Sequence, residues 1–157
     1  MLDMAIDFDT RLKVPMQMFL AGPSGAGKTT ILRQVLDNLD TLFVAPFERI
    51  IWAYGIEAAN MPRDDPRVLL VDGPPDMRLL DNVNGNTLLI IDDLMLYYAK
   101  HPDELKKLFT VVGHHKRVSI IFVVQNLFGV DRTARSNSHY ICLCHTADKL
   151  QIRSLAS

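Results

Sequence analysis

The sequence predicts an α/β domain in which a mostly parallel sheet lies between two layers of helices. Continuous apolar runs at 87–91 and 118–124 are typical of strands that a parallel sheet buries on both faces. Segments with the apolar spacing of an amphipathic helix alternate along the chain with strand-like runs. Because such an alternation builds parallel sheets that helices cover on both faces, we expect a three-layer sandwich.

The expected elements follow one another without repeats or low-complexity tracts. Residues 1–15 form a lead-in segment that ends at the first core strand. Strands are expected at 16–21, 43–45, 49–55, 68–71, 87–91, 118–124 and 139–143, where 43–45 and 49–55 are either two strands or one broken strand. Helices are expected at 30–39, from Pro102, which two acids follow, and from Thr146. The segment 58–67 is expected to be an exposed loop.

Length and composition predict a single domain spanning residues 1–157. The 157 residues are 48% hydrophobic and 22% charged, which is enough to bury one core. The formal net charge of -1 argues against nucleic-acid binding through the overall field, so any DNA contact must come from a local patch or from several copies. Cys142 and Cys144 are interpreted as reduced core residues of an intracellular protein. No apolar segment approaches membrane-spanning length, and we expect no membrane partner.

A glycine-rich stretch between the first strand and the first helix matches the phosphate-binding loop called Walker A. Its residues are Gly22, Pro23, Ser24, Gly25, Ala26, Gly27, Lys28 and Thr29, with Thr30 directly after them. The glycines let successive backbone N–H groups point at an anion, and the start of the helix adds partial positive charge. Lys28 is expected at the β- and γ-phosphates, the Thr29 hydroxyl at Mg²⁺ and Thr30 at the α-phosphate. The motif in this setting predicts binding of a nucleoside triphosphate with Mg²⁺ rather than a chance match in a turn.

The apolar run 88–91 ends in two acids, as in a Walker B strand. Asp92 is expected to hold Mg²⁺ through a coordinated water or through the Thr29 hydroxyl. Asp93 is the candidate that orients or deprotonates the attacking water. A solvated strand end is the alternative, and the phosphate loop upstream favours the catalytic interpretation.

Polar residues after the run 118–124 are the next candidates. Gln125 is a candidate sensor that bonds the γ-phosphate and the attacking water, and the alternative is a plain polar strand terminus. Arg132 and Arg135 are candidates for an arginine finger that a neighbouring subunit supplies, with Arg49 behind them, although most surface arginines are only solvated charge.

The one basic cluster consists of His114, His115, Lys116 and Arg117, on a loop expected between a helix and a strand. As a contact to the DNA backbone it would bind phosphates without sequence preference. As an ordinary solvated turn it would have no such role, and the sequence leaves both interpretations open.

Together these residues resemble a known family. The segments GPSGAGKTT, IIWAYG, LLIIDDLM, LFTVVGHHKRVSIIFVVQNLF and RTARSNSHYICLC are similar to the genome-packaging ATPases of the FtsK/HerA superfamily, in particular the compact viral branch that includes the poxvirus packaging ATPase and the Maverick-type elements. The resemblance extends from about residue 16 to the end of the chain. In two respects the chain departs from it: Asp93 stands where many relatives carry Glu, and the chain stops at 151–157, where relatives often continue.

The resemblance implies a RecA-like P-loop NTPase core and a homo-oligomeric ring, pentamer or hexamer. It implies ATP hydrolysis with Mg²⁺, in which Lys28, Thr29, Asp92 and Asp93 have the roles given above and Gln125 is the sensor. It further implies translocation of double-stranded DNA into a capsid at the site of virion assembly, with a capsid or portal protein as a partner.

Two other functions stay open at this point. GPSGAGKTT also resembles the phosphate loop of guanylate kinases, so a nucleotide kinase is the alternative enzyme, although its reaction does not call for paired acids with a Gln sensor. A non-hydrolysing ATP-binding switch is the alternative from a different class. A GTPase is disfavoured, because the segment 146–149 is the nearest to an Asn-Lys-x-Asp guanine reader and does not match it.

Overall fold

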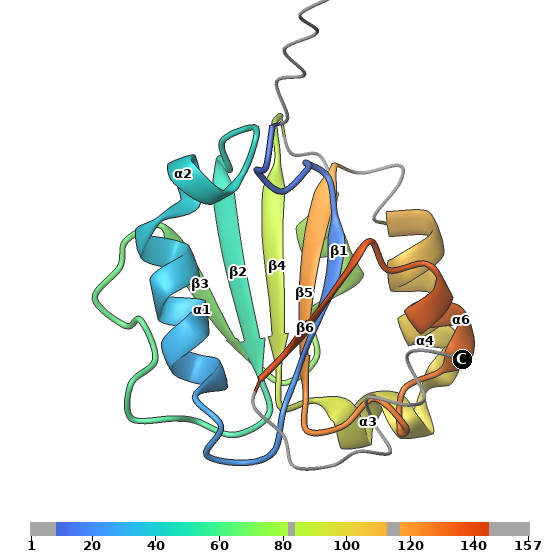
Figure 1. Cartoon of the computed structure of the whole chain (residues 1–157). Coiled ribbons are helices and arrows are strands. Elements are labelled where there is room, and N and C mark those ends of the chain that lie inside the picture. The colour runs from blue at the N-terminus through green and yellow to red at the C-terminus, as the bar shows by residue number, and fades with distance from the viewer. Residues whose placement is uncertain (1–8, 82–83, 113–116, 145–157) are drawn as a thin grey trace, which may run out of the picture.

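The computed structural model describes residues 9–81, 84–112 and 117–144, and its centre is one six-stranded sheet (Figure 1). The strands are β1 (Gln17–Ala21), β2 (Arg49–Tyr54), β3 (Val68–Asp72), β4 (Thr87–Asp92), β5 (Val118–Val124) and β6 (Tyr140–Leu143). They lie side by side in the order β3-β2-β4-β5-β1-β6, and every neighbouring pair is parallel. The predicted α/β fold with a mostly parallel sheet is therefore confirmed, as an all-parallel sheet in the described part.

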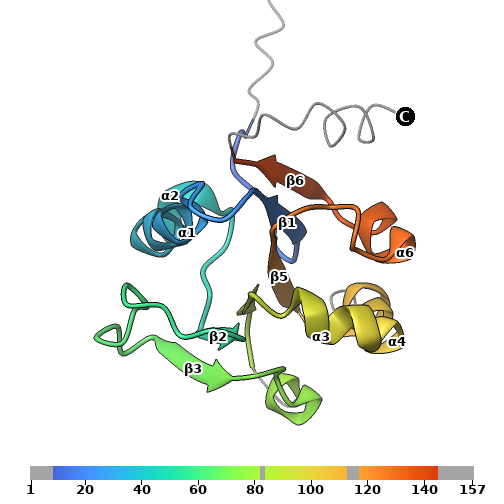
Figure 2. The same cartoon turned by 90° about the horizontal axis from the view of Figure 1, so that it is seen from below.

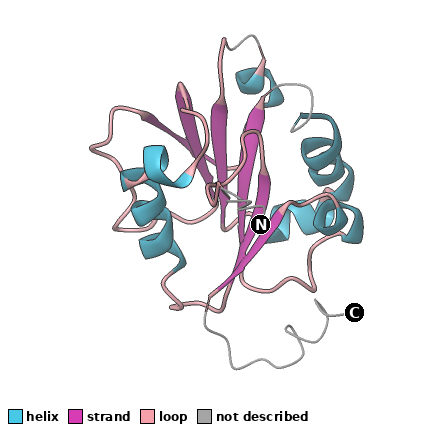
Figure 3. Cartoon of the chain, turned by 45° about the horizontal axis from the view of Figure 1, so that its top comes forward, coloured by secondary structure: helices cyan, strands magenta, loops and turns pink. Residues whose placement is uncertain are grey.

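Helices cover both faces of the sheet, as Figures 2 and 3 show. On one face lie α1 (Lys28–Asp37) and α2 (Leu39–Leu42), and on the other lie α3 (Met95–Lys100), α4 (Pro102–Lys107), the π-helix η2 (Leu108–Val112) and α6 (Arg132–Ser136). A 3₁₀ helix, η1 (Met77–Leu80), connects β3 to β4. The layers are those that the strand–helix alternation predicts.

Two apolar cores result, one on each face of the sheet. Trp52 and the α1 residues Leu32 and Leu36 belong to the first core, and Phe19 and Phe109 to the second, where their rings stack at 5.0 Å. The central strand β5 is buried along its whole length, whereas the edge strands β3 and β6 are only partly covered. Continuous apolar runs therefore fill the centre of the sheet, as expected of parallel strands that helices cover on both sides.

The structure differs from the expected elements in several places. The first helix begins at Lys28 instead of residue 30, directly after Gly27, so the last two residues of the phosphate motif are helical. The segment 43–45 is not a strand, because Phe43 makes only an isolated parallel bridge to Leu12. The helices α3, η1 and α6 were not expected, and α6 lies in a segment, 131–138, that the sequence predicts to be a loop. Each has six residues or fewer, which is too short for a helical period to stand out. The helix expected from Thr146 lies outside the described residues.

Candidate nucleotide-binding site

The phosphate loop connects β1 to α1, the position that its chemistry requires. Gly25 and Gly27 have φ values of 77° and 89°, which a residue with a side chain rarely adopts. Gly27 is the N-cap of α1 without any side-chain cap, so the first amides of the helix are left for a ligand. The Lys28 ammonium donates hydrogen bonds to the carbonyl oxygens of Gly22 at 2.6 Å and Pro23 at 2.8 Å. Its charge is thereby held against the loop.

A pocket of about 550 Å³ opens at the carboxyl edge of the sheet, beside this loop. It is lined by Ser24, Gly25, Gly27, Lys28, Thr29, Thr30, Ile56, Ala58, Asn60, Asp92, Asp93, Met95, Leu96, Val123, Val124 and Gln125. The structure thus brings the loop, the paired acids and the Gln125 amide to one cavity. Gly22, Pro23 and Ala26 do not line it, and the first two instead supply the carbonyl groups that hold Lys28.

The order of the strands explains how distant residues meet at this pocket. β5 lies between β1 and β4, and its Val124 pairs with Ala21 while Val123 pairs with Asp92. Gln125, the next residue, is therefore placed between the phosphate loop and the paired acids. Ligands of parallel α/β sheets bind at this edge, beyond the carboxyl ends of the strands.

Asp92 is partly buried at the end of β4, and its environment favours a nearby cation. Burial raises the pKa of Asp92 above its usual value, and the neighbouring Asp93 charge raises it further. Two groups oppose the rise: the Trp52 indole N–H and the Lys28 ammonium. Within the described part of the chain, the buried Trp52 nitrogen has no hydrogen-bond partner of normal geometry. An ionised Asp92 is thus costly here unless positive charge lies beside it.

The donor set fits Mg²⁺ bound together with a nucleotide. Asp92 and Thr29 line the same pocket and offer a carboxylate and a hydroxyl, the hard oxygen ligands that Mg²⁺ prefers. Among the described residues there is no group of three or more His, Cys, Asp or Glu side chains that could hold a metal ion alone. The remaining ligands would be water and phosphate oxygens, as is usual for Mg²⁺ in nucleotide sites.

Asp93 differs from Asp92 in exposure and in backbone conformation. Its side chain is exposed at the pocket, and its φ of 57° lies in the left-handed region. Asp and Asn tolerate this region better than other residues with a side chain. The chain therefore turns sharply between β4 and α3 at the residue predicted to act on water.

One wall of the pocket was not anticipated from the sequence. It comes from the segment after β2, of which Ile56, Ala58 and Asn60 line the cavity. The wall is tied to α1, because Arg33 Nη1 donates to the Asn60 carbonyl oxygen at 3.0 Å. The only signal in the sequence was that this segment follows a strand that ends at the same edge.

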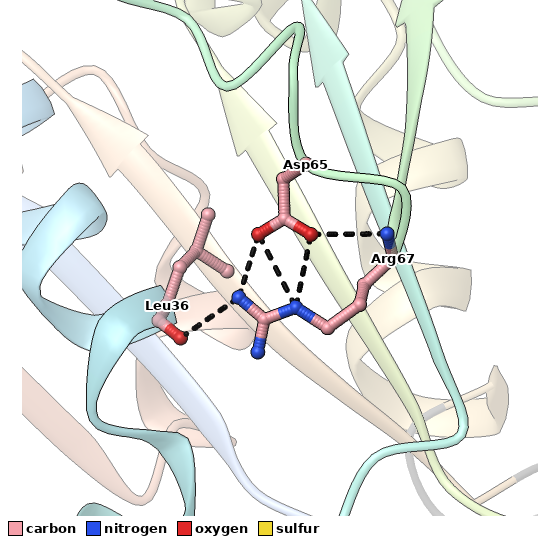
Figure 4. Close-up of polar contacts among 3 residues, drawn as sticks. All are labelled: Leu36, Asp65 and Arg67. Atoms are coloured by element: carbon pink, nitrogen blue, oxygen red, sulfur yellow. Dashed lines mark hydrogen bonds and ion pairs between the residues drawn. The ribbon is translucent and has the colours of Figure 1, made fainter.

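A second set of polar contacts connects the end of this segment, residues 56–67, to α1 (Figure 4). Arg67 Nη2 pairs with Asp65 Oδ2 at 2.6 Å and donates to the Leu36 carbonyl oxygen at 3.3 Å. The Asp65 carboxylate also accepts from the Arg67 backbone N–H at 3.0 Å. The hydrogen bond from Arg67 lowers the pKa of Asp65, which keeps the pair ionised.

The candidate arginine fingers lie away from the pocket. Arg132 and Arg135 are on α6, and neither is among the residues that line the cavity. Arg132 is exposed, whereas Arg135 is partly buried and its Nε has no hydrogen-bond partner among the described residues. Arg49 begins β2, at the opposite edge of the sheet from the pocket.

The basic cluster is described only at its last residue, since His114, His115 and Lys116 lie outside the described residues. Arg117 is exposed and directly precedes β5, so it lies at the amino edge of the sheet, opposite the pocket. Its carbonyl oxygen accepts from the Thr87 backbone N–H at 3.1 Å. No helix in the described part of the chain is long and apolar enough to cross a membrane.

Comparisons with known proteins show what the chain resembles. The family model of the poxvirus A32 protein matches residues 78–154, which include the paired acids and Gln125. No curated protein sequence matches the chain.

Solved structures share the fold at low sequence identity. The genome packaging NTPase B204 from Sulfolobus turreted icosahedral virus 2, in complex with ATP-gammaS, is 15% identical, with a TM-score of 0.60 over 90% of this chain and 81% of that chain. Its complex with sulfate has a TM-score of 0.57 at 14% identity, over 90% of this chain and 80% of that chain. The cytoplasmic domain of EssC has a TM-score of 0.67 at 13% identity, and the match covers 90% of this chain but only 33% of that chain. These comparisons confirm the predicted resemblance: the chain is similar to the poxvirus A32 proteins over residues 78–154 and has the fold of a viral genome packaging NTPase.

Proposed function

We propose that the chain is the ATPase of a viral genome-packaging machine. The observation that carries the proposal is the pocket itself, where a phosphate loop, two acids at the end of β4 and the Gln125 amide meet. The similarity to the poxvirus A32 proteins and to the packaging NTPase B204 supports ATP as the nucleotide and viral DNA packaging as the process.

Each of the main pocket residues has one role in the proposed hydrolysis. The loop amides and the N-terminus of α1 bind the phosphates, and Lys28 exchanges its two carbonyl partners for phosphate oxygens. Thr29 and Asp92 would hold Mg²⁺, which neutralises charge that develops on the phosphates. Asp93 accepts a proton from the attacking water, and Gln125 orients that water from the neighbouring strand.

Coupling to DNA requires more than one copy of the chain. A net charge of -1 does not attract DNA, and the pocket has no arginine among its described lining residues. A homo-oligomeric ring, pentamer or hexamer, would supply both the missing arginine and the missing positive charge. Each subunit would place Arg132 or Arg135 at the pocket of its neighbour and would contribute a few basic groups to binding of double-stranded DNA. The ring would act inside the infected cell where virions assemble, against a capsid or portal protein.

Hydrolysis assays on three variants test the proposal. Lys28→Ala removes charge from the β- and γ-phosphates and Asp92→Ala removes the metal ligand, so both should abolish turnover. Asp93→Asn should keep nucleotide binding and lower kcat by about a hundredfold or more, the usual contribution of a general base. The matched control is Asp72→Asn, because Asp72 ends β3 at the same edge of the sheet but does not line the pocket.

The outcomes separate the competing functions. Wild-type turnover in Asp93→Asn contradicts the base assignment. Tight ATP binding without hydrolysis, with and without double-stranded DNA, indicates a switch. Phosphoryl transfer to a nucleoside monophosphate in preference to water indicates a kinase. Stimulation of hydrolysis by double-stranded DNA supports the packaging motor.

A further inference from the structure

The end of β2 packs directly against the backbone of the paired acids. Gly55 follows β2, and its N–H donates to the Asp92 carbonyl oxygen at 2.9 Å. This bond extends the parallel pairing of Tyr54 with Asp92 by one residue. On the other side, the Gly73 N–H donates to the Tyr54 carbonyl oxygen at 2.8 Å. Both neighbouring strands therefore hydrogen-bond to the peptide group between Tyr54 and Gly55.

The space beside Gly55 is occupied by the backbone of Asp93. A Cβ placed on Gly55 would lie 2.1 Å from the Asp93 carbonyl oxygen and 3.0 Å from its carbonyl carbon. These are backbone atoms, which cannot rotate aside as the end of a long side chain can. The Leu94 side chain closes the space further, with Cδ2 at 3.3 Å. A residue with a side chain fits at position 55 only if Asp93 moves.

The contact falls on a residue whose conformation is already unusual. Asp93 has a φ of 57°, whereas Gly55 itself lies outside the left-handed region. An alanine at position 55 would therefore be acceptable to its own backbone and would act on Asp93 alone. Because the Asp93 side chain lines the pocket from this turn, any shift of its backbone redirects its carboxylate.

We propose that Gly55 is a positioning residue for Asp93. By lacking a side chain, it leaves the space in which Asp93 takes its left-handed conformation and aims its carboxylate at the pocket. The proposal rests on the proposed function, because there Asp93 is the group that accepts the proton from water. It assigns a functional reason to a glycine that neither lines the pocket nor belongs to the phosphate loop.

Gly55→Ala tests the proposal, and Gly73→Ala is its matched control. Gly73 follows the neighbouring strand β3 with a φ of 89°, and a Cβ placed on it would meet no described residue within 4 Å. Gly73→Ala thus strains its own backbone without touching Asp93, and should lower thermal stability while kcat stays at the wild-type value. Gly55→Ala should keep the affinity for an ATP analogue within about threefold and lose kcat to the level of Asp93→Asn, about a hundredfold.

A double-mutant cycle shows whether Gly55 acts through Asp93. In the Asp93→Asn background, Gly55→Ala should cause no further loss of kcat, because the group that it misdirects is already gone. A further loss of tenfold or more, or wild-type kcat in Gly55→Ala, overturns the proposal. If Asp93→Asn itself turns over at the wild-type rate, the assigned base is wrong, and the positioning role falls with it. If only Asp93→Asn loses turnover, the proposed function stands and the role of Gly55 does not.

If Gly55→Ala is too unstable for enzyme assays, the melting temperature of a second variant tests the same contact. Adding Asp93→Gly frees position 93 to move away from the new methyl group, since glycine has the widest choice of backbone conformations. By circular dichroism, Asp93→Gly should raise the melting temperature more in the Gly55→Ala background than in the wild type, where it only relieves the left-handed conformation of Asp93. An equal or smaller rise in the Gly55→Ala background overturns the proposed contact, whatever the enzyme assays show.

Discussion

Arg67 connects the pocket wall to α1, and we expect its removal to affect both stability and nucleotide binding. Arg67→Ala removes the pair with Asp65 and the hydrogen bond to the Leu36 carbonyl oxygen (Figure 4). Arg67 is the last residue of the segment 56–67. Ile56, Ala58 and Asn60 of this segment line the pocket. We therefore expect a loss of stability together with weaker nucleotide binding.

The magnitude follows from exposure and geometry. The Asp65 side chain is 19% exposed and that of Arg67 is 51% exposed, so solvent screens the pair and it contributes about 0.5 kcal/mol. The bond to Leu36 is long at 3.3 Å and adds about 0.5 kcal/mol. The sum of about 1 kcal/mol corresponds to a decrease in Tm of about 2–4 °C for a domain of this size.

Arg78 provides a matched control. It pairs with Asp76 two residues earlier through the same set of contacts, with Nη2 to Oδ2 at 2.6 Å. Its side chain is 88% exposed, however, and it donates to no carbonyl oxygen of another element in the part of the chain that the structure describes. Urea denaturation should show a lower free energy of unfolding for Arg67→Ala and no measurable change for Arg78→Ala. The KM for ATP should rise in Arg67→Ala only, while kcat changes little, because the reacting groups are untouched.

The pH dependence gives an independent check. The pKa of Asp65 is lowered in the folded state, so the pair stabilises the fold above the unfolded pKa of Asp65, about 4, and this stabilisation is lost as the pH falls through the lower folded value. The difference between wild type and Arg67→Ala should thus be full at pH 7 and shrink in strong acid. Equal effects of Arg67→Ala and Arg78→Ala, or a difference that does not depend on pH, would refute the reasoning.

Two further predictions concern the ring and DNA. Lys28→Ala subunits keep the arginines of α6, so mixing them with Arg132→Ala or Arg135→Ala subunits should partly restore hydrolysis, because one subunit would complete the site of another. Full activity of a monomer at high dilution contradicts this prediction. Lys116→Ala combined with Arg117→Ala should weaken DNA binding equally across sequences and reduce its salt dependence, without changing DNA-independent hydrolysis; unchanged DNA affinity in a binding titration identifies the basic cluster as a solvated turn.

Local sequence patterns predicted most of the framework of the site. The strand, glycine-rich loop and helix around Lys28 form one continuous segment, so the order of residue types was enough to place them. The apolar runs that became β4 and β5 predicted central strands, because a strand buried on both faces has no polar positions. Asp92 and Gln125 were placed at one edge because parallel strands all end on the same side of their sheet.

Other features depend on contacts between distant segments and left no pattern in the sequence. The six residues of α3 show no clear helical period, and no local pattern indicates that Phe43 forms only an isolated bridge to Leu12 instead of a strand. In the sequence, the pocket wall around Asn60 has the pattern of an ordinary exposed loop. Its hydrogen bond from Arg33 on α1 is seen only in the structure.

The sequence by itself predicts the type of chemistry and the edge of the sheet at which we expect it, because a phosphate loop and paired acids are short motifs whose expected roles follow from their own atoms. The tertiary structure alone decided how these motifs face one another. It put β5 between β1 and β4, which brings Gln125 between the loop and the acids. It also set the Asp93 backbone against Gly55, a contact between two strand ends that are far apart in the chain. Such contacts arise only when strands pair across the sheet, since no local preference of Gly55 or Asp93 specifies the other as its neighbour.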